Sequence, residues 1–78
     1  MHTVIIYGAG CAKCAQVEAL VRQVVLEAHL AVAVHKVGDI SEIVAAGVIS
    51  TPTVAVDDVI KSSGRVPTTV EIHQWLMG

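Results

Sequence analysis

The feature that most constrains the fold of this 78-residue chain is a change of hydrophobic period near its start. Residues 2–7 (HTVIIY) form a continuous β-branched and aromatic run, which predicts a buried strand. Gly8 and Gly10 end that strand, and apolar residues then recur at helical spacing over residues 12–30, at Val17, Leu20, Val21, Val24 and Ala28. A strand followed at once by a helix indicates an α/β domain.

The rest of the chain continues the alternation. Residues 31–37 predict a second strand, and residues 39–47 predict a short helix. Asp39 is expected to cap that helix, with Glu42 at capping-box spacing and Gly47 at its C-terminal end. Its core-facing residues are expected to be Ile40, Ile43 and Val44.

The C-terminal third predicts a hairpin and a helix. Residues 53–56 and 59–62 are strand-like and flank the turn residues Asp57 and Asp58. Thr68 and Glu71 form a second capping-box pair ahead of Ile72, Trp75 and Leu76, which predicts a closing helix.

The predicted order is therefore βαβαββα, an α/β fold with a four-stranded mixed sheet and helices on both faces. The first two strands, joined through a helix, should be parallel with a right-handed crossover. We expect residues 1–78 to form a single domain. The cysteine loop leaves the C-terminal end of the first strand, where open α/β sheets place their sites.

Composition excludes several classes of function. Apolar residues make up 54% of the chain and charged residues 15%, which argues against disorder. A net charge of −2 argues against a nucleic-acid partner. The longest uncharged run, residues 43–56, has 14 residues broken by Gly47 and Pro52, too short to span a membrane. The N-terminus does not have the pattern of a signal peptide, so we expect the protein in the cytoplasm. We also expect it to be a monomer.

Both cysteines lie at the strand-to-helix junction, as Cys11 and Cys14. The unpaired N–H groups and partial positive charge of a helix N-terminus favour a thiolate at Cys11, so we expect Cys11 to be the more acidic and more exposed thiol. Gly8 and Gly10 are expected to leave room for another chain to approach. A CxxC at such a junction favours redox exchange over soft-metal binding or a purely structural role.

Metal binding through the two thiolates is the alternative interpretation. Two cysteines make an incomplete zinc site, and no further metal ligand is expected, because the four histidines lie on four different predicted elements. Copper chaperones of ferredoxin-like fold also carry CxxC after a first strand. They end on a strand and have Met two residues before the first cysteine, where this chain has Ala9.

Three segments together resemble a known family: GAGCAKC at residues 8–14, STPTVAVDD at 50–58 and SGRV at 63–66. The chain is similar to the small redox-active disulfide proteins, archaeal and bacterial members of the thioredoxin-like superfamily that are close to glutaredoxin in size. The resemblance implies a thioredoxin fold, a Cys11 nucleophile and a resolving Cys14, which form a Cys11–Cys14 disulfide. It also implies a cis-proline at Pro52.

The implied activity is thiol–disulfide exchange with protein disulfides, an electron-transport role in cell redox homeostasis that needs no cofactor and no metal. Gly10, Thr51 and Pro52 are the expected substrate-binding residues, with the Thr51 backbone pairing with an extended substrate segment. The chain lacks the paired glycines and the acidic residue with which glutaredoxins hold glutathione. We therefore expect glutathione to be a poor reductant and a protein reductase or small dithiol to recycle the pair.

Overall fold

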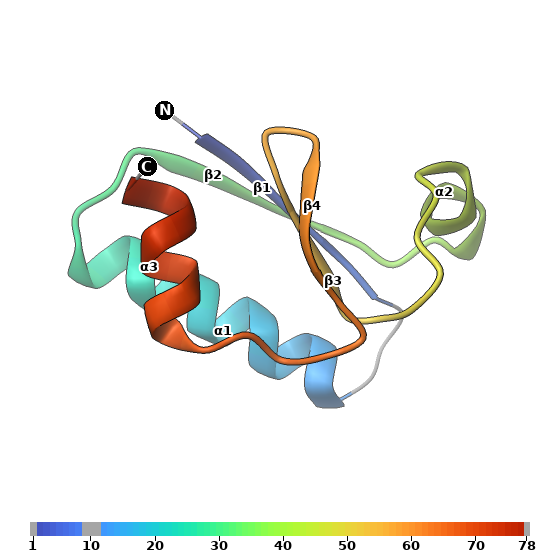
Figure 1. Ribbon diagram of the computed structural model, residues 1–78, viewed down its shortest axis with the longest axis horizontal. Helices are drawn as coiled ribbons and strands as arrows, with labels where there is room; N and C mark the ends of the chain where they lie inside the picture. Colours follow the sequence, from blue (N-terminus) through green and yellow to red (C-terminus); the bar gives the residue numbers. More distant parts are fainter. Residues whose placement is uncertain (1, 9–11, 78) are drawn as a thin grey trace.

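A computed structural model describes residues 2–8 and 12–77 (Figure 1). Within them the chain follows the predicted order βαβαββα. The elements are β1 (His2–Tyr7), α1 (Ala12–Glu27), β2 (Val32–Val37), α2 (Ile40–Ala45), β3 (Thr53–Val56), β4 (Val59–Ser63) and α3 (Thr69–Met77).

The strands form one mixed sheet in the order β2-β1-β3-β4. β1 and β2 are parallel, from His2 opposite Val32 to Tyr7 opposite Val37. The hairpin adds β3 antiparallel to β1, with Tyr7 opposite Thr53, and β4 antiparallel to β3. The predicted α/β fold with a four-stranded mixed sheet is thus confirmed.

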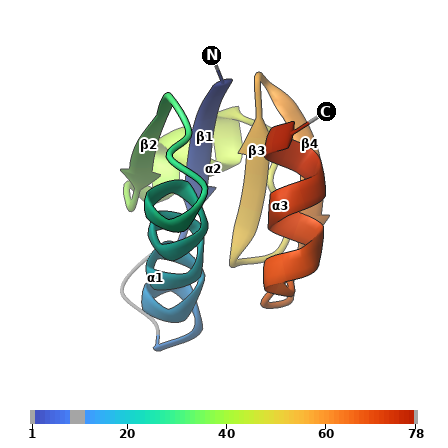
Figure 2. The same ribbon diagram turned by 90° about the vertical axis from the view of Figure 1, so that its left-hand side faces the viewer.

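Helices cover both faces of the sheet, as predicted. α1 and α3 lie side by side on one face, whereas α2 lies behind the sheet in Figure 2. The larger core forms under α1 and α3 and is aliphatic, made of Val4, Ile6, Val17, Val21, Val24, Val54, Val56, Ile72 and Leu76. Within the described part of the chain, no helix is long and apolar enough to cross a membrane.

α1 ends at Glu27, three residues earlier than the predicted limit of Leu30. The cause is local: His29 adopts a left-handed φ of 52°, and the Leu30 N–H donates to the Val25 carbonyl at 3.1 Å. The left-handed position after a helix is usually occupied by glycine. Because His29 occupies it here, the sequence did not indicate where the helix ends.

α2 differs from the expectation in which side chains it buries. The Asp39 carboxylate caps the helix by accepting from the Ser41 N–H at 2.8 Å, as predicted. However, Ile40 and Val44 are 70% and 68% exposed, and only Ile43 of the three expected residues is buried. In a six-residue helix, Ile40 and Val44 lie one turn apart on a single stripe, and that stripe faces away from the sheet.

The predicted hairpin forms around Asp57 and Asp58, whose φ angles of 50° and 67° fit a two-residue primed turn. The Asp57 carboxylate accepts from the Thr3 N–H at 2.9 Å and lies 2.5 Å from His2 Nδ1. These two hydrogen bonds, first the one with His2 and then the one with Thr3, lower the pKa of Asp57. The hairpin turn is thereby tied to the start of β1.

One buried hydroxyl in the hairpin lacks a partner, which leads to a stability prediction. Ser62 is 6% exposed, and its Oγ has no hydrogen-bond partner among the described residues. We expect Ser62→Ala to raise the free energy of unfolding by about 1 kcal/mol, because a buried unpaired hydroxyl is removed. Urea denaturation measures this change.

The neighbouring serine is the matched control. Ser63 Oγ lies 3.1 Å from Thr53 Oγ1 and 3.4 Å from the Ser50 carbonyl oxygen. Ser63→Ala should therefore lower the free energy of unfolding by about 1 kcal/mol. If Ser62→Ala is as destabilising as Ser63→Ala, the Ser62 hydroxyl has a partner and the prediction is wrong.

Candidate active site

Cys14 lies in the first turn of α1 and is fully buried. It is not a free thiol, since the described residues contain no free cysteine. Cys11 and Gly10, the other predicted residues of this loop, lie outside the described residues. Their roles and the pairing of Cys11 with Cys14 therefore stay predictions.

Gly8 has a role that the sequence analysis missed. A Cβ atom at Gly8 would lie 2.2 Å from Cys14 Sγ and 2.9 Å from Cys14 Cβ, so only glycine leaves room for the sulfur. The Gly8 N–H donates to the Val37 carbonyl at 2.9 Å, which holds this backbone against the end of β2. The space at Gly8 was expected to admit another chain; instead it is filled from within by Cys14.

The Thr51–Pro52 peptide bond is cis, in agreement with the expectation. Pro52 is fully buried, whereas Thr51 is exposed. Because Thr53 pairs with Tyr7, the residues just outside that pair, Pro52 and Gly8, lie at the same end of the sheet. The fold thereby brings the proline loop and the N-terminal turn of α1, which carries Cys14, to the same end of the sheet.

The end of β4 holds this proline loop. The Gly64 N–H donates to the Pro52 carbonyl at 2.9 Å, and Thr53 Oγ1 donates to the Ser50 carbonyl at 2.5 Å. Gly64 has a φ of +75°, and a Cβ there would lie 3.2 Å from Ser50 Cβ. Gly64 reaches Pro52 and Ser50, which lie 12 and 14 positions before it in the chain, only once the hairpin has formed, so the sequence did not predict these contacts.

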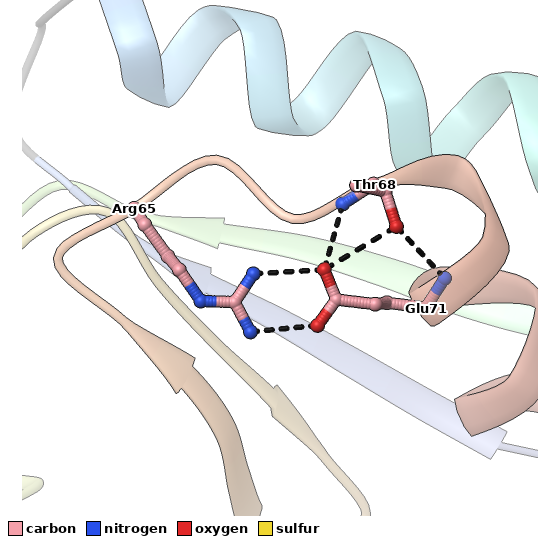
Figure 3. Close-up of polar contacts among 3 residues, drawn as sticks. All are labelled: Arg65, Thr68 and Glu71. Atoms are coloured by element: carbon pink, nitrogen blue, oxygen red, sulfur yellow. Dashed lines mark hydrogen bonds and ion pairs between the residues drawn. The ribbon is translucent and has the colours of Figure 1, made fainter.

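Arg65, the next residue, forms a two-hydrogen-bond ion pair with a carboxylate of α3 (Figure 3). Arg65 Nη1 and Nη2 donate to Glu71 Oε1 and Oε2 at 2.8 and 2.7 Å. Glu71 Oε1 also accepts from the Thr68 N–H at 3.1 Å, and the Glu71 N–H donates to Thr68 Oγ1 at 3.2 Å. The predicted Thr68–Glu71 capping box is confirmed, and Arg65 extends it into a three-residue cluster.

The electrostatics of this cluster lead to a pH prediction. The hydrogen bonds from Arg65, then from the Thr68 N–H, lower the pKa of Glu71 from 4.5 to about 2. A lowered pKa in the folded state means that the ionised form stabilises the fold above pH 4.5, and that this contribution is lost as the pH falls through about 2. We expect the acid-induced loss of stability between those values to be shallower in Glu71→Gln, measured by urea denaturation at a series of pH values. Equal slopes in the two proteins would contradict the prediction.

Cys14 is buried in a part of the structure that has no buried charged side chain among the described residues. The buried polar side chains of the described residues are Thr53 and Ser62, and no buried Asp, Glu, Lys, Arg or His is found among them. Within residues 2–8 and 12–77, no group of three or more His, Cys, Asp and Glu side chains is placed to hold a metal ion.

Comparison with known proteins adds independent information. A family model described as "Thioredoxin domain" matches residues 1–77. The chain is 41% identical to a thioredoxin of Methanocaldococcus jannaschii over 76 residues, which cover 97% of this chain and 87% of that protein. It is 36% identical over 76 residues to a thioredoxin of Methanothermobacter thermautotrophicus, which cover 97% and 99% of the two chains.

Proposed function

The chain belongs to the thioredoxin domain family, and from that premise we propose that it is a thiol–disulfide oxidoreductase acting on protein disulfides through Cys11 and Cys14. The observation that supports the assignment best is the position of Cys14, buried in the first turn of α1 against Gly8. The cis-proline loop lies at the same end of the sheet.

In the proposed reaction the Cys11 thiolate attacks one sulfur of a substrate disulfide. The substrate S–S bond breaks, one substrate sulfur leaves as a thiolate that takes up a proton, and a mixed disulfide with Cys11 forms. Cys14 then loses its proton and attacks the Cys11 sulfur. This step forms the Cys11–Cys14 disulfide and releases the second substrate thiol, so that two electrons have passed to the substrate.

The buried position of Cys14 supports its role as the resolving thiol. A buried cysteine is less reactive toward an outside partner than an exposed thiol at a helix N-terminus. Cys14 thus reacts only once Cys11 has brought a mixed disulfide to it. The backbone of Thr51, an exposed residue beside Pro52, is the proposed contact for an extended substrate segment.

The reductant is proposed to be a protein reductase or a small dithiol, with glutathione a poor substitute. Arg65 is a cation beside the cis-proline loop that a glutathione carboxylate could use, and Glu71 already accepts from both of its terminal nitrogens. A reducing compartment such as the cytoplasm suits such a dithiol, and we propose that the protein acts there as a monomer.

Reduction of insulin disulfides by the metal-free protein tests the proposal, with dithiothreitol as the electron source. The expected result is turnover by the wild-type protein and none above background by Cys11→Ser. Absence of turnover, combined with tight stoichiometric binding of a soft metal ion that Cys11→Ser abolishes, would instead identify a metal-binding module.

A further inference from the structure

The positively charged guanidinium of Arg65 lies beside the proposed active site, but it is paired with a carboxylate of the same chain. Arg65 follows Gly64, whose N–H donates to the Pro52 carbonyl at 2.9 Å, so its backbone is held beside the cis-proline loop. Its side chain is 50% exposed, so an anion from solvent has access to it. Both of its terminal nitrogens are nevertheless directed at Glu71 (Figure 3).

We propose that Glu71 is a specificity-determining residue, which occupies Arg65 and thereby prevents the site from recruiting small thiols that carry a carboxylate. The proposal rests on the thiol–disulfide exchange proposed above and names the class of reductant that the site rejects. A bidentate carboxylate is the ligand that a guanidinium binds best, and Glu71 already supplies one.

A carboxylate from solvent competes poorly with Glu71. Glu71 is held in place by the Thr68 N–H as well as by Arg65, so it stays near the guanidinium at a high effective concentration. The pKa of Glu71, lowered to about 2, keeps its carboxylate ionised wherever thiolates react. Without Glu71, Arg65 would present an unpaired positive charge and a free pair of donors to an incoming anionic thiol.

The substitution Glu71→Gln removes the negative charge of residue 71 without removing its role as a helix cap. Glutamine serves at the third position of a capping box as well as glutamate does, so the bond to the Thr68 N–H can be kept while the ion pair is lost. Reduction of the oxidised protein is then compared for 3-mercaptopropionate, which is anionic, and 2-mercaptoethanol, which is neutral, at matched thiolate concentration.

Each reduction consumes two monothiols. The first thiolate breaks the protein disulfide and forms a mixed disulfide, and the second attacks the small-molecule sulfur, which leaves two protein thiols and one oxidised small disulfide. Acid quenching, alkylation and mass spectrometry count the protein thiols formed.

We expect Glu71→Gln to raise the ratio of the anionic rate to the neutral rate about three- to tenfold at low ionic strength, with the gain shrinking in about 0.5 M salt. The double variant Arg65→Ala/Glu71→Gln removes both charges, and its ratio should return to the wild-type value. Glu42→Gln, which removes an exposed negative charge from α2, controls for net charge alone and should change the ratio less than twofold.

Two results would overturn the inference: a Glu71→Gln gain no larger than that of Glu42→Gln, or a gain that persists when Arg65 is absent. Either result leaves the proposed oxidoreductase activity untouched if the wild-type protein still reduces insulin. Conversely, a wild-type protein without insulin turnover defeats the proposed function, whatever the ratio of the two monothiol rates.

Discussion

Gly8→Ala is expected to lower insulin-reducing activity by about 10- to 100-fold and the free energy of unfolding by about 2 kcal/mol. The added Cβ would lie 2.2 Å from Cys14 Sγ, a separation that nonbonded atoms do not tolerate. The Gly8 N–H donates to the Val37 carbonyl, which holds the Gly8 backbone in place. The added Cβ should therefore displace Cys14 and the first turn of α1. Stability is measured by urea denaturation of the oxidised protein and activity by the insulin assay.

Gly38→Ala is the matched control, because a Cβ at Gly38 would meet its nearest neighbour, the Gly8 carbonyl oxygen, at an ordinary 3.5 Å. A double-mutant cycle adds a sharper test. Under reducing conditions, so that none of the four proteins has a disulfide, Gly8→Ala should cost at least about 1 kcal/mol less in a Cys14→Ala background, where the sulfur is gone, than in the wild type. An equal cost in both backgrounds would show that the contact with the Cys14 sulfur is not the cause.

Cys14→Ser is expected to lower turnover by about 100-fold or more and to trap the substrate as a mixed disulfide on Cys11. Serine fits the buried space beside Gly8 but cannot displace the bound substrate sulfur. A disulfide-bonded peptide incubated with the reduced variant should add the mass of one peptide chain, and dithiothreitol should remove it. Intact-mass spectrometry before and after reduction measures both.

Cys11→Ser provides the control, since Cys14 is fully buried and should form no adduct with the peptide. An adduct on Cys14 in that variant, and none on Cys11 in Cys14→Ser, would reverse the proposed roles of the two thiols. An absence of adducts in both variants would argue against exchange with peptide disulfides.

The sequence by itself determined those features that depend on neighbours within one or two turns of the chain. The order of strands and helices follows from local hydrophobic period, and the Asp39 cap and the Thr68–Glu71 box follow from residues two to three positions apart. The primed turn at Asp57 and Asp58 is equally local. The position of the cis bond at Pro52 was implied by the resemblance to the thioredoxin-like superfamily.

Only the tertiary structure decided which side chains meet across elements. The contact of Gly8 with Cys14 requires α1 to fold back over the end of β1, and the bond of Gly64 to Pro52 requires the hairpin. The outward-facing stripe of α2 was likewise set by how that short helix lies behind the sheet. The pairing of Arg65 with Glu71 was likewise set by the loop that leads from β4 into α3. Such contacts join residues that are far apart in the sequence and are brought together by packing, and no local sequence pattern encodes them.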